Sequence, residues 1–195
     1  MKRGKLIVFE GVSGTGKETQ AKLLQKYLAA HHIMSRIVFH PSLELKEILS
    51  AWRKERAIDA VTEIYLLLAD RSSRVRQLIV PALEKGEWII SLRNYVSALV
   101  YQAKSDKDRH WITKEFLRFE PKPDLLFYFD ISSKDAMKRI LLRGEPLGKF
   151  ETPSLLNEKR NNYKNVLKTI THTTLYASQS IEQTHHYITS HLPTF

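Results

Sequence analysis

The sequence predicts an α/β fold of three layers, with a five-stranded parallel sheet flanked by helices. Short apolar stretches alternate with longer segments of helical periodicity along nearly the whole chain, a pattern that is typical of parallel sheets. A glycine-rich loop follows the first apolar stretch and directly precedes a helical pattern. The 195 residues are enough for one well-packed core, so we expect residues 1–195 to form a single domain.

Five short segments are the predicted strands, and most of them are rich in branched or aromatic residues. They are Lys5 to Glu10, Ser35 to Phe39, Trp88 to Ser91, Leu125 to Asp130 and Thr174 to Ala177. In an open parallel sheet, ligands bind beyond the carboxyl ends of the strands. The loops that follow the first four strands should therefore line one cleft.

The longest helical pattern runs from about Ala60 to Lys85 and repeats its apolar residues at steps of three, four and seven. We expect this apolar face to pack on the sheet. Pro81 lies inside the pattern, which predicts either a kink or a break between two helices. From Arg143 to Pro153 the periodicity is lost and glycine and proline appear, so we expect a mobile lid at about 143–153.

The glycine-rich loop carries the strongest functional signal in the chain. Its residues are Gly11, Val12, Ser13, Gly14, Thr15, Gly16 and Lys17. Small residues let successive backbone N–H groups surround an anion, the next helix adds its dipole, and Lys17 can reach the β and γ phosphates of a nucleotide. Glu18 stands where such loops place the Ser or Thr that binds Mg²⁺, and Thr19 follows it.

Composition and charge narrow the classes of partner. The formal net charge of +10 indicates either attraction to nucleic acids or a cleft suited to small phosphorylated substrates. Basic residues are scattered among acidic ones, which favours small substrates over a nucleic-acid partner. No apolar run approaches the roughly 18 residues of a membrane span, and the N-terminal residues lead directly into a predicted strand. We therefore expect a cytoplasmic protein with no membrane partner. The absence of cysteine excludes disulfides and thiolate metal sites.

Further segments occur in one order along almost the whole chain. They are Phe9 to Lys17, Thr19 to Leu24, Ala69 to Arg71, Pro81 to Glu84, Trp88 to Ile90, Ser97 with Tyr101 and Gln102, Pro123 to Asp130, Lys138 to Ile140 before Arg143, Lys149 to Glu151, and Ala177 to Glu182. With these segments the chain resembles thymidylate kinases, which transfer the γ-phosphoryl group of ATP to dTMP. The resemblance implies the P-loop NTPase fold with a small lid, ATP and Mg²⁺ as cofactors, and a homodimer.

The resemblance also implies roles for residues on the acceptor side. Arg93 matches the arginine that contacts the acceptor phosphate. Arg71 matches the arginine that contacts the acceptor nucleotide, although the residues alone also allow an exposed cation paired with Asp70 or Glu63. Three further residues recur on one helical face and match the acceptor pocket, while the alternative for that face is packing on the sheet. They are Ser97, Tyr101 and Gln102.

Two cations of the predicted lid match catalytic positions of the family. Arg143 lies where the family stacks an arginine on adenine, and Lys149 occupies a lid position that is usually arginine. Because the phosphate loop contains Gly14 and Thr15 but no arginine, the chain resembles the subgroup whose lid supplies the transition-state cation. Arg143 and Lys149 are therefore the candidates for that cation, beside Lys17 and Arg93.

Several positions depart from the family pattern. On the acceptor side, Ser13 replaces an acid that contacts the sugar, and Leu67 replaces an aromatic residue that stacks on the base. Glu18 replaces the metal-binding hydroxyl residue, and Leu92 and Asn94 replace the acid and the tyrosine of the family's Asp-Arg-Tyr segment. Residues 40–43 lack the arginine that the family has there. Glu18 is either a direct ligand of Mg²⁺ or a repulsive charge, and in a compensated site Glu18, Glu10 or Asp130 would contact the ion through water. The alternative function is a nucleotide-binding homologue with weak or no catalysis and a regulatory or interaction role.

Overall fold

The structure is a computed structural model, and it describes residues 2–55 and 58–193. The described residues form one sheet of five parallel strands in the order β2-β3-β1-β4-β5. The strands are β1 (Leu6–Glu10), β2 (Ser35–Phe39), β3 (Trp88–Leu92), β4 (Leu125–Asp130) and β5 (Thr173–Tyr176). The predicted α/β class and all five predicted strands are confirmed, with ends that differ by no more than one residue.

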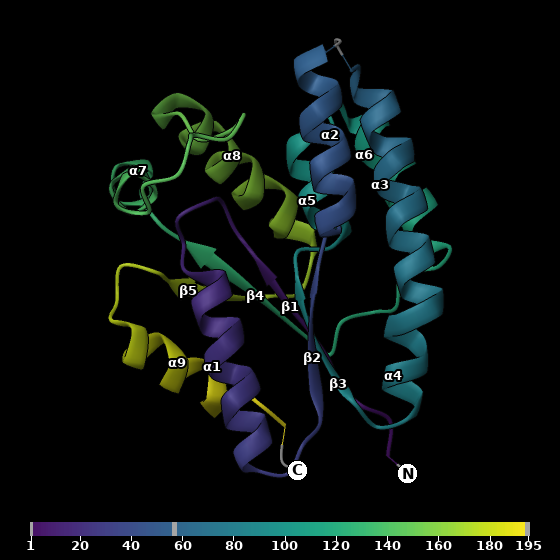
Figure 1. The fold of residues 1–195 in the computed structure, drawn as a ribbon, viewed down its shortest axis with the longest axis vertical. Helices are drawn as coiled ribbons and strands as arrows, with labels where there is room; N and C mark the ends of the chain where they lie inside the picture. The colour runs from purple at the N-terminus through teal and green to yellow at the C-terminus, as the bar shows by residue number, and fades with distance from the viewer. Residues whose placement is uncertain (1, 56–57, 194–195) are drawn as a thin grey trace.

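Helices cover the two faces of this sheet (Figure 1). They are α1 (Lys17–Ala30), α2 (Leu43–Glu55), α3 (Ala60–Arg74), α4 (Val80–Glu84), α5 (Tyr95–Tyr101), α6 (Asp106–Leu117), α7 (Ser133–Leu142), α8 (Pro153–Val166) and α9 (Ile181–Ser190), with a π-helical segment η1 (Val75–Ile79) and a 3₁₀ segment η2 (Leu167–Thr169). Figure 1 shows α1 and α9 together on one side of the strands and α3 with α4 on the other. Among the described residues, no helix is both long and apolar enough to cross a membrane.

The central strand β1 explains why the sheet forms. Leu6 to Phe9 have no exposed surface, as expected for a parallel strand that is covered by helices on both faces. The ring of Phe9 packs edge-on against Phe127 and Phe129 of β4, with ring centroids 5.8 and 5.0 Å apart. This packing holds the carboxyl end of β1, where the glycine-rich loop begins, in the middle of the sheet.

Pro81 does not break the long helical segment. The backbone stays in the right-handed helical region at Arg74 and Val80, on either side of η1. Figure 1 accordingly shows α3 and α4 following one path. Pro81 lies in the first turn of α4, where a missing backbone N–H costs least, and the π-helical turn before it absorbs the misfit. Of the two predicted outcomes the break is therefore wrong.

The predicted lid lies between α7 and α8. Residues 143–152 are turns and irregular structure. The segment ends where Thr152 caps α8, because its side chain accepts a hydrogen bond from the backbone N–H of Leu155, and Pro153 fits the first helical turn. The mobility of this segment stays a prediction.

Candidate active site

The glycine-rich loop has a backbone shape that requires its glycines. Gly14 and Gly16 adopt φ values of 77° and 86°, in the left-handed region that other residues rarely adopt. A Cβ at Gly14 would lie 2.6 Å from the backbone oxygen of Ala136, so a side chain there would also clash. The loop opens directly into the 14-residue helix α1, whose N-terminus favours an anion. The geometry therefore fits an anion such as a phosphate group.

Lys17 begins α1 and folds back over the loop. Its Nζ donates hydrogen bonds to the backbone oxygen of Val12 at 2.7 Å and to Oγ1 of Thr15 at 2.8 Å. Burial lowers the pKa of Lys17 well below its usual range, and the charge of Arg93 lowers it further, against the opposite effect of Glu10. A buried ammonium whose bonded partners are neutral is suited to meet an anionic ligand.

In the described part of the chain, few carboxylates near the phosphate loop are available as ligands for Mg²⁺. Glu18 is exposed in the first turn of α1, as is Thr19. The described residues contain no group of three or more His, Cys, Asp or Glu side chains that could hold a metal ion. Mg²⁺ commonly relies on one or two carboxylates together with phosphates and water, so Glu18 fits that limited role. Asp130 is instead paired with Arg160, at 2.5 Å, and with Lys164.

Arg93 occupies the position at the end of β3 with an unusual backbone. Its φ of 75° places a residue other than glycine in the left-handed region, which costs energy and is found disproportionately at functional sites. Its guanidinium donates to Oγ of Ser97 and to the hydroxyl of Tyr163, both at 2.9 Å, and to the hydroxyl of Tyr101 at 3.4 Å. Burial opposes its charge, but Tyr101, Tyr163 and Glu10 outweigh burial and raise the pKa of Arg93. The group is therefore a permanent cation.

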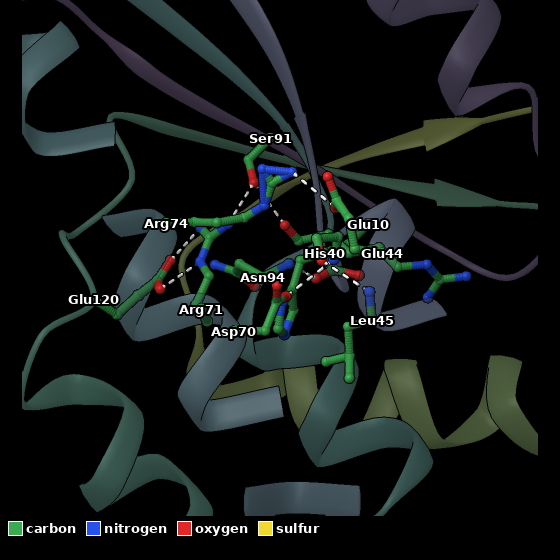
Figure 2. Close-up of polar contacts among 12 residues, drawn as sticks. Glu10, His40, Glu44, Leu45, Asp70, Arg71, Arg74, Ser91, Asn94 and Glu120 are labelled. Carbon is green, nitrogen blue, oxygen red and sulfur yellow. Dashed lines mark hydrogen bonds and ion pairs between the residues drawn. The ribbon is translucent and has the colours of Figure 1, made fainter. Parts of the chain in front are cut away.

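Glu10, at the end of β1, is the centre of this cluster. It is fully buried, and its two carboxylate oxygens accept hydrogen bonds from the backbone N–H of Asn94, the hydroxyl of Ser97 and the hydroxyl of Tyr163. The first of these contacts is visible in Figure 2. No local pattern in the sequence predicts a site role for Tyr163. For Glu10 the sequence predicts only a contact to Mg²⁺ through water, although an acid directly after four apolar residues and before the loop is a usable signal for a buried site residue.

The three predicted acceptor residues, two on α5 and one just after it, have different surroundings. Ser97 and Tyr101 face Arg93, as described above. Gln102 is also buried, but its Nε2 donates to Oε2 of Glu63 on α3 at 3.2 Å. The alternative that this face only packs on the sheet does not describe the polar contacts that Ser97 and Gln102 make.

Arg71 is buried in an ion pair with Glu120 (Figure 2). The guanidinium has no exposed surface, and it donates to both carboxylate oxygens of Glu120 at 2.8 and 2.6 Å and to Oγ of Ser91 at 3.2 Å. The alternative of an exposed cation paired with Asp70 or Glu63 is therefore wrong. Because 49 residues separate Arg71 from Glu120, no local pattern predicted this pair. A contact between Arg71 and the acceptor stays a prediction.

Three of the departures from the family pattern, Leu67, Leu92 and Asn94, are buried in the structure. Leu92 is buried in β3 with Phe9 and Phe39 as its neighbours in register, and Leu67 is buried in α3. Asn94 is buried and caps α5, because its side chain accepts from the backbone N–H of Val96. Leucine at the first two positions therefore adds to the apolar core instead of leaving a polar gap.

The loop after β2 lacks an arginine and contains a buried histidine. Figure 2 shows His40 beside Asp70, with Nδ1 and the nearer carboxylate oxygen 3.6 Å apart. Asp70 accepts a hydrogen bond from the backbone N–H of Ser42 at 2.9 Å. Burial lowers the pKa of His40 despite this acidic neighbour, so the loop offers no cation to an acceptor phosphate at neutral pH.

Each cation of the lid is paired with a buried acid. Arg143 pairs with Glu151 at 3.0 Å and with Glu145 at 2.8 Å. Burial alone would raise the pKa of Glu151, but the N–H of Gly148, the nearby Ser13 hydroxyl and Arg143 together hold that pKa below its usual range. Glu151 therefore connects the lid with the phosphate loop.

Lys149 extends from the lid towards α3, which carries Glu63. Its Nζ lies 3.2 Å from Oε1 of Glu63, a residue that is 3% exposed. The same carboxylate accepts from Arg53 of α2 at 2.9 Å and from Gln102. Burial would raise the pKa of Glu63, but Arg53, Gln102 and Lys149 hold it below its usual range, so the carboxylate stays ionised. The sequence predicts Glu63 only as an alternative partner of Arg71, and no local pattern indicates its contact with the lid.

The chain is similar to proteins of one family. A family model described as thymidylate kinase matches residues 9–188. A thymidylate kinase from Akkermansia muciniphila is 35% identical over 172 residues, which cover 85% of this chain and 80% of that protein. A probable thymidylate kinase from Pyrococcus horikoshii is 36% identical, with 83% and 82% of the two chains covered. A thymidylate kinase from Buchnera aphidicola is 34% identical, and the match covers 87% of this chain and 84% of that protein.

Proposed function

Because the chain belongs to the thymidylate kinase family, we propose that it transfers the γ-phosphoryl group of ATP to dTMP, forming dTDP and ADP. The observation that carries the proposal is the position of the phosphate loop beside Arg93. Strands β1 and β3 are paired with Phe9 opposite Leu92, and the backbone N–H of Arg93 donates to the oxygen of Phe9 at 2.9 Å. A triphosphate in the loop and an anion bound by Arg93 would therefore meet at neighbouring strand ends.

In phosphoryl transfer the protein mainly positions the two substrates and neutralises charge, and it takes little covalent part in the reaction. We assign Lys17 to the β and γ phosphates and Arg93 to the acceptor phosphate. Arg143 and Lys149 would leave Glu151 and Glu63 to contact the adenine and the transferred group. Mg²⁺, when bound, would neutralise charge on the β and γ phosphates, and Glu18 is the residue that we propose to hold it.

The acceptor nucleotide would lie on the α5 side of Arg93. We propose that Ser97, Tyr101 and Gln102 line its pocket, with polar groups for the sugar and base. A contact of the nucleotide with Arg71, which is fully buried and paired with Glu120, would require that pair to open. A homodimer and a cytoplasmic location, both expected from the sequence, stay predictions. No observation on the described residues or the relatives favours the alternative of a homologue without catalysis.

The proposal is tested by ADP release from ATP and Mg²⁺ in the presence of dTMP, dUMP, dCMP, dGMP and the corresponding ribonucleotides. We expect turnover of about 1 per second or more, with dTMP as the preferred acceptor, since this is the ordinary range for enzymes. The double variant Glu18→Ser with Leu92→Asp should gain little if the site is competent as it stands. Tight ATP binding with no acceptor-dependent ADP would overturn the proposal.

A further inference from the structure

Lys159 on α8 is an unusually buried lysine. Its side chain is 11% exposed, although lysine stems on helices normally carry the ammonium out to water. Among the described residues its one ion-pair partner is the adjacent Glu158, 2.8 Å away, whose side chain is 53% exposed. A solvated neighbouring carboxylate compensates weakly for burying an ammonium. A second anion near Lys159 would therefore stabilise its buried ammonium.

Two aromatic rings lie close to the ammonium of Lys159. Nζ lies 5.9 Å from the ring centroid of Tyr101 and 5.8 Å from that of Phe150, within the range of cation–π attraction. The two rings themselves pack edge to face, with centroids 4.9 Å apart. Tyr101 belongs to α5 and Phe150 to the lid, so Lys159 lies where these two elements meet.

Other cations surround the same pair of rings. The guanidinium carbon of Arg93 lies 5.1 Å from the centroid of Tyr101, and Nζ of Lys149 lies 5.2 Å from that of Phe150. Lys149 is paired with Glu63, and Arg93 is connected with Glu10 through Ser97 and Tyr163. Lys159, in contrast, has only the exposed Glu158 as an ion-pair partner among the described residues. An anion placed at the two rings would therefore compensate the charge of Lys159. A phosphate dianion has the charge and the acceptor oxygens for this position.

The register of α8 connects Lys159 with the reaction centre. Lys159 and Tyr163 are four residues apart, so they share one face of the helix. The hydroxyl of Tyr163 donates to Glu10 at 2.7 Å and accepts from Arg93 at 2.9 Å. Lys159 is therefore one helical turn from the Glu10 and Arg93 cluster.

We propose that Lys159 binds the phosphate of the acceptor nucleotide together with Arg93. This inference rests on the proposed function, because it assumes that the nucleotide monophosphate occupies the α5 side of the cleft. Lys159 would supply a cation that the loop after β2 does not offer, since residues 40–43 contain a buried histidine and no arginine. The transferred phosphoryl group of ATP is the competing ligand for this cation.

The test is calorimetric titration of the wild type, Lys159→Met and Lys159→Arg with dTMP, with thymidine and with ATP. Thymidine carries no phosphate, so it reports the pocket without the proposed contact. We expect Lys159→Met to weaken dTMP binding roughly ten- to a hundredfold, the usual effect of losing a charged hydrogen bond, and to leave thymidine and ATP unchanged. Lys159→Arg keeps the charge and should retain most of the affinity. Lys168→Met, an exposed lysine just after α8, is the matched control and should bind as the wild type does.

The outcomes separate the two proposals. A wild type that binds ATP but neither binds nor phosphorylates dTMP would overturn the proposed function and the inference together. A wild type that phosphorylates dTMP, with Lys159→Met binding dTMP equally well, would overturn the inference alone. Equal weakening of thymidine would show that Lys159 only supports the fold of the pocket. Weakening of ATP alone would assign the cation to the transferred group.

Discussion

The phosphate loop and the acceptor side of the cleft are built in different ways. In the loop, Lys17 finds its partners Val12 and Thr15 within five residues of itself. On the acceptor side, Glu10 and Tyr163 bond to each other across 153 residues of sequence, and Arg71 pairs with Glu120 across 49. The loop is therefore built from contacts within one short segment, whereas the contacts of the acceptor side join distant segments and contribute to the stability of the fold.

The comparison therefore predicts its largest effect at the Arg71 and Glu120 pair. Arg71→Met should lower the free energy of unfolding by about 3–5 kcal/mol, because it leaves the buried Glu120 carboxylate without its cation. Urea unfolding measures this. Arg118→Met, at the end of α6, removes a cation that is 73% exposed and should change stability by about 0.5 kcal/mol at most. If Arg71→Met were as stable as Arg118→Met, the buried pair on the acceptor side would not stabilise the fold.

Lys17→Met should show the opposite behaviour. We expect kcat to fall about 100- to 1000-fold, the usual effect of removing a group that stabilises the transition state. The free energy of unfolding should change little or rise, because the ammonium is buried without a bonded acid. Steady-state kinetics and urea unfolding on the same preparation test both parts. A loss of stability comparable to that of Arg71→Met would contradict the contrast between the two regions.

Glu63→Gln tests how the acceptor side holds the lid. The substitution removes the charge that holds Lys149 away from the transferred group, so we expect kcat/KM to rise about three- to tenfold. Adding Lys149→Met should abolish this gain, because the lysine that Glu63 releases is then absent. Glu44→Gln is the control, because that acid also faces an arginine but is 79% exposed. Effects that multiplied in the double variant would mean that the two residues act separately.

The smallest expected effect is a proton taken up when ATP binds. Burial lowers the pKa of Lys17, so between that lowered pKa and the usual value of about 10.4 part of the free protein carries a neutral Lys17. Phosphates favour the charged form, so binding at a pH between the lowered pKa and the usual value should take up a fraction of a proton, and the uptake should vanish below the lowered pKa. Calorimetry in two buffers of different ionisation enthalpy measures this uptake. The same uptake in Lys17→Met would assign the proton to another group.

The sequence determined the elements whose signals are local. Apolar stretches with branched and aromatic residues predicted the five strands, since burial on both faces requires such residues in the middle of a parallel sheet. Glycines at 14 and 16 predicted the phosphate loop, because the φ values near 80° that it needs suit no other residue as well. The effect of Pro81 was predicted only as a kink or a break, because the choice depends on whether a π-helical turn can absorb the misfit.

Only the tertiary structure decided which charged groups meet. Nothing near Arg71 in the sequence distinguishes Glu120 from the closer acids Asp70 and Glu63, and nothing near Glu63 indicates that Lys149 of the lid reaches it. Periodicity says which face of a helix is buried, but the partner of a buried charge depends on which elements pack side by side. Which elements pack together depends on burial summed over the whole core. A local stretch of sequence therefore predicts the phosphate loop but does not predict the contacts of the acceptor side.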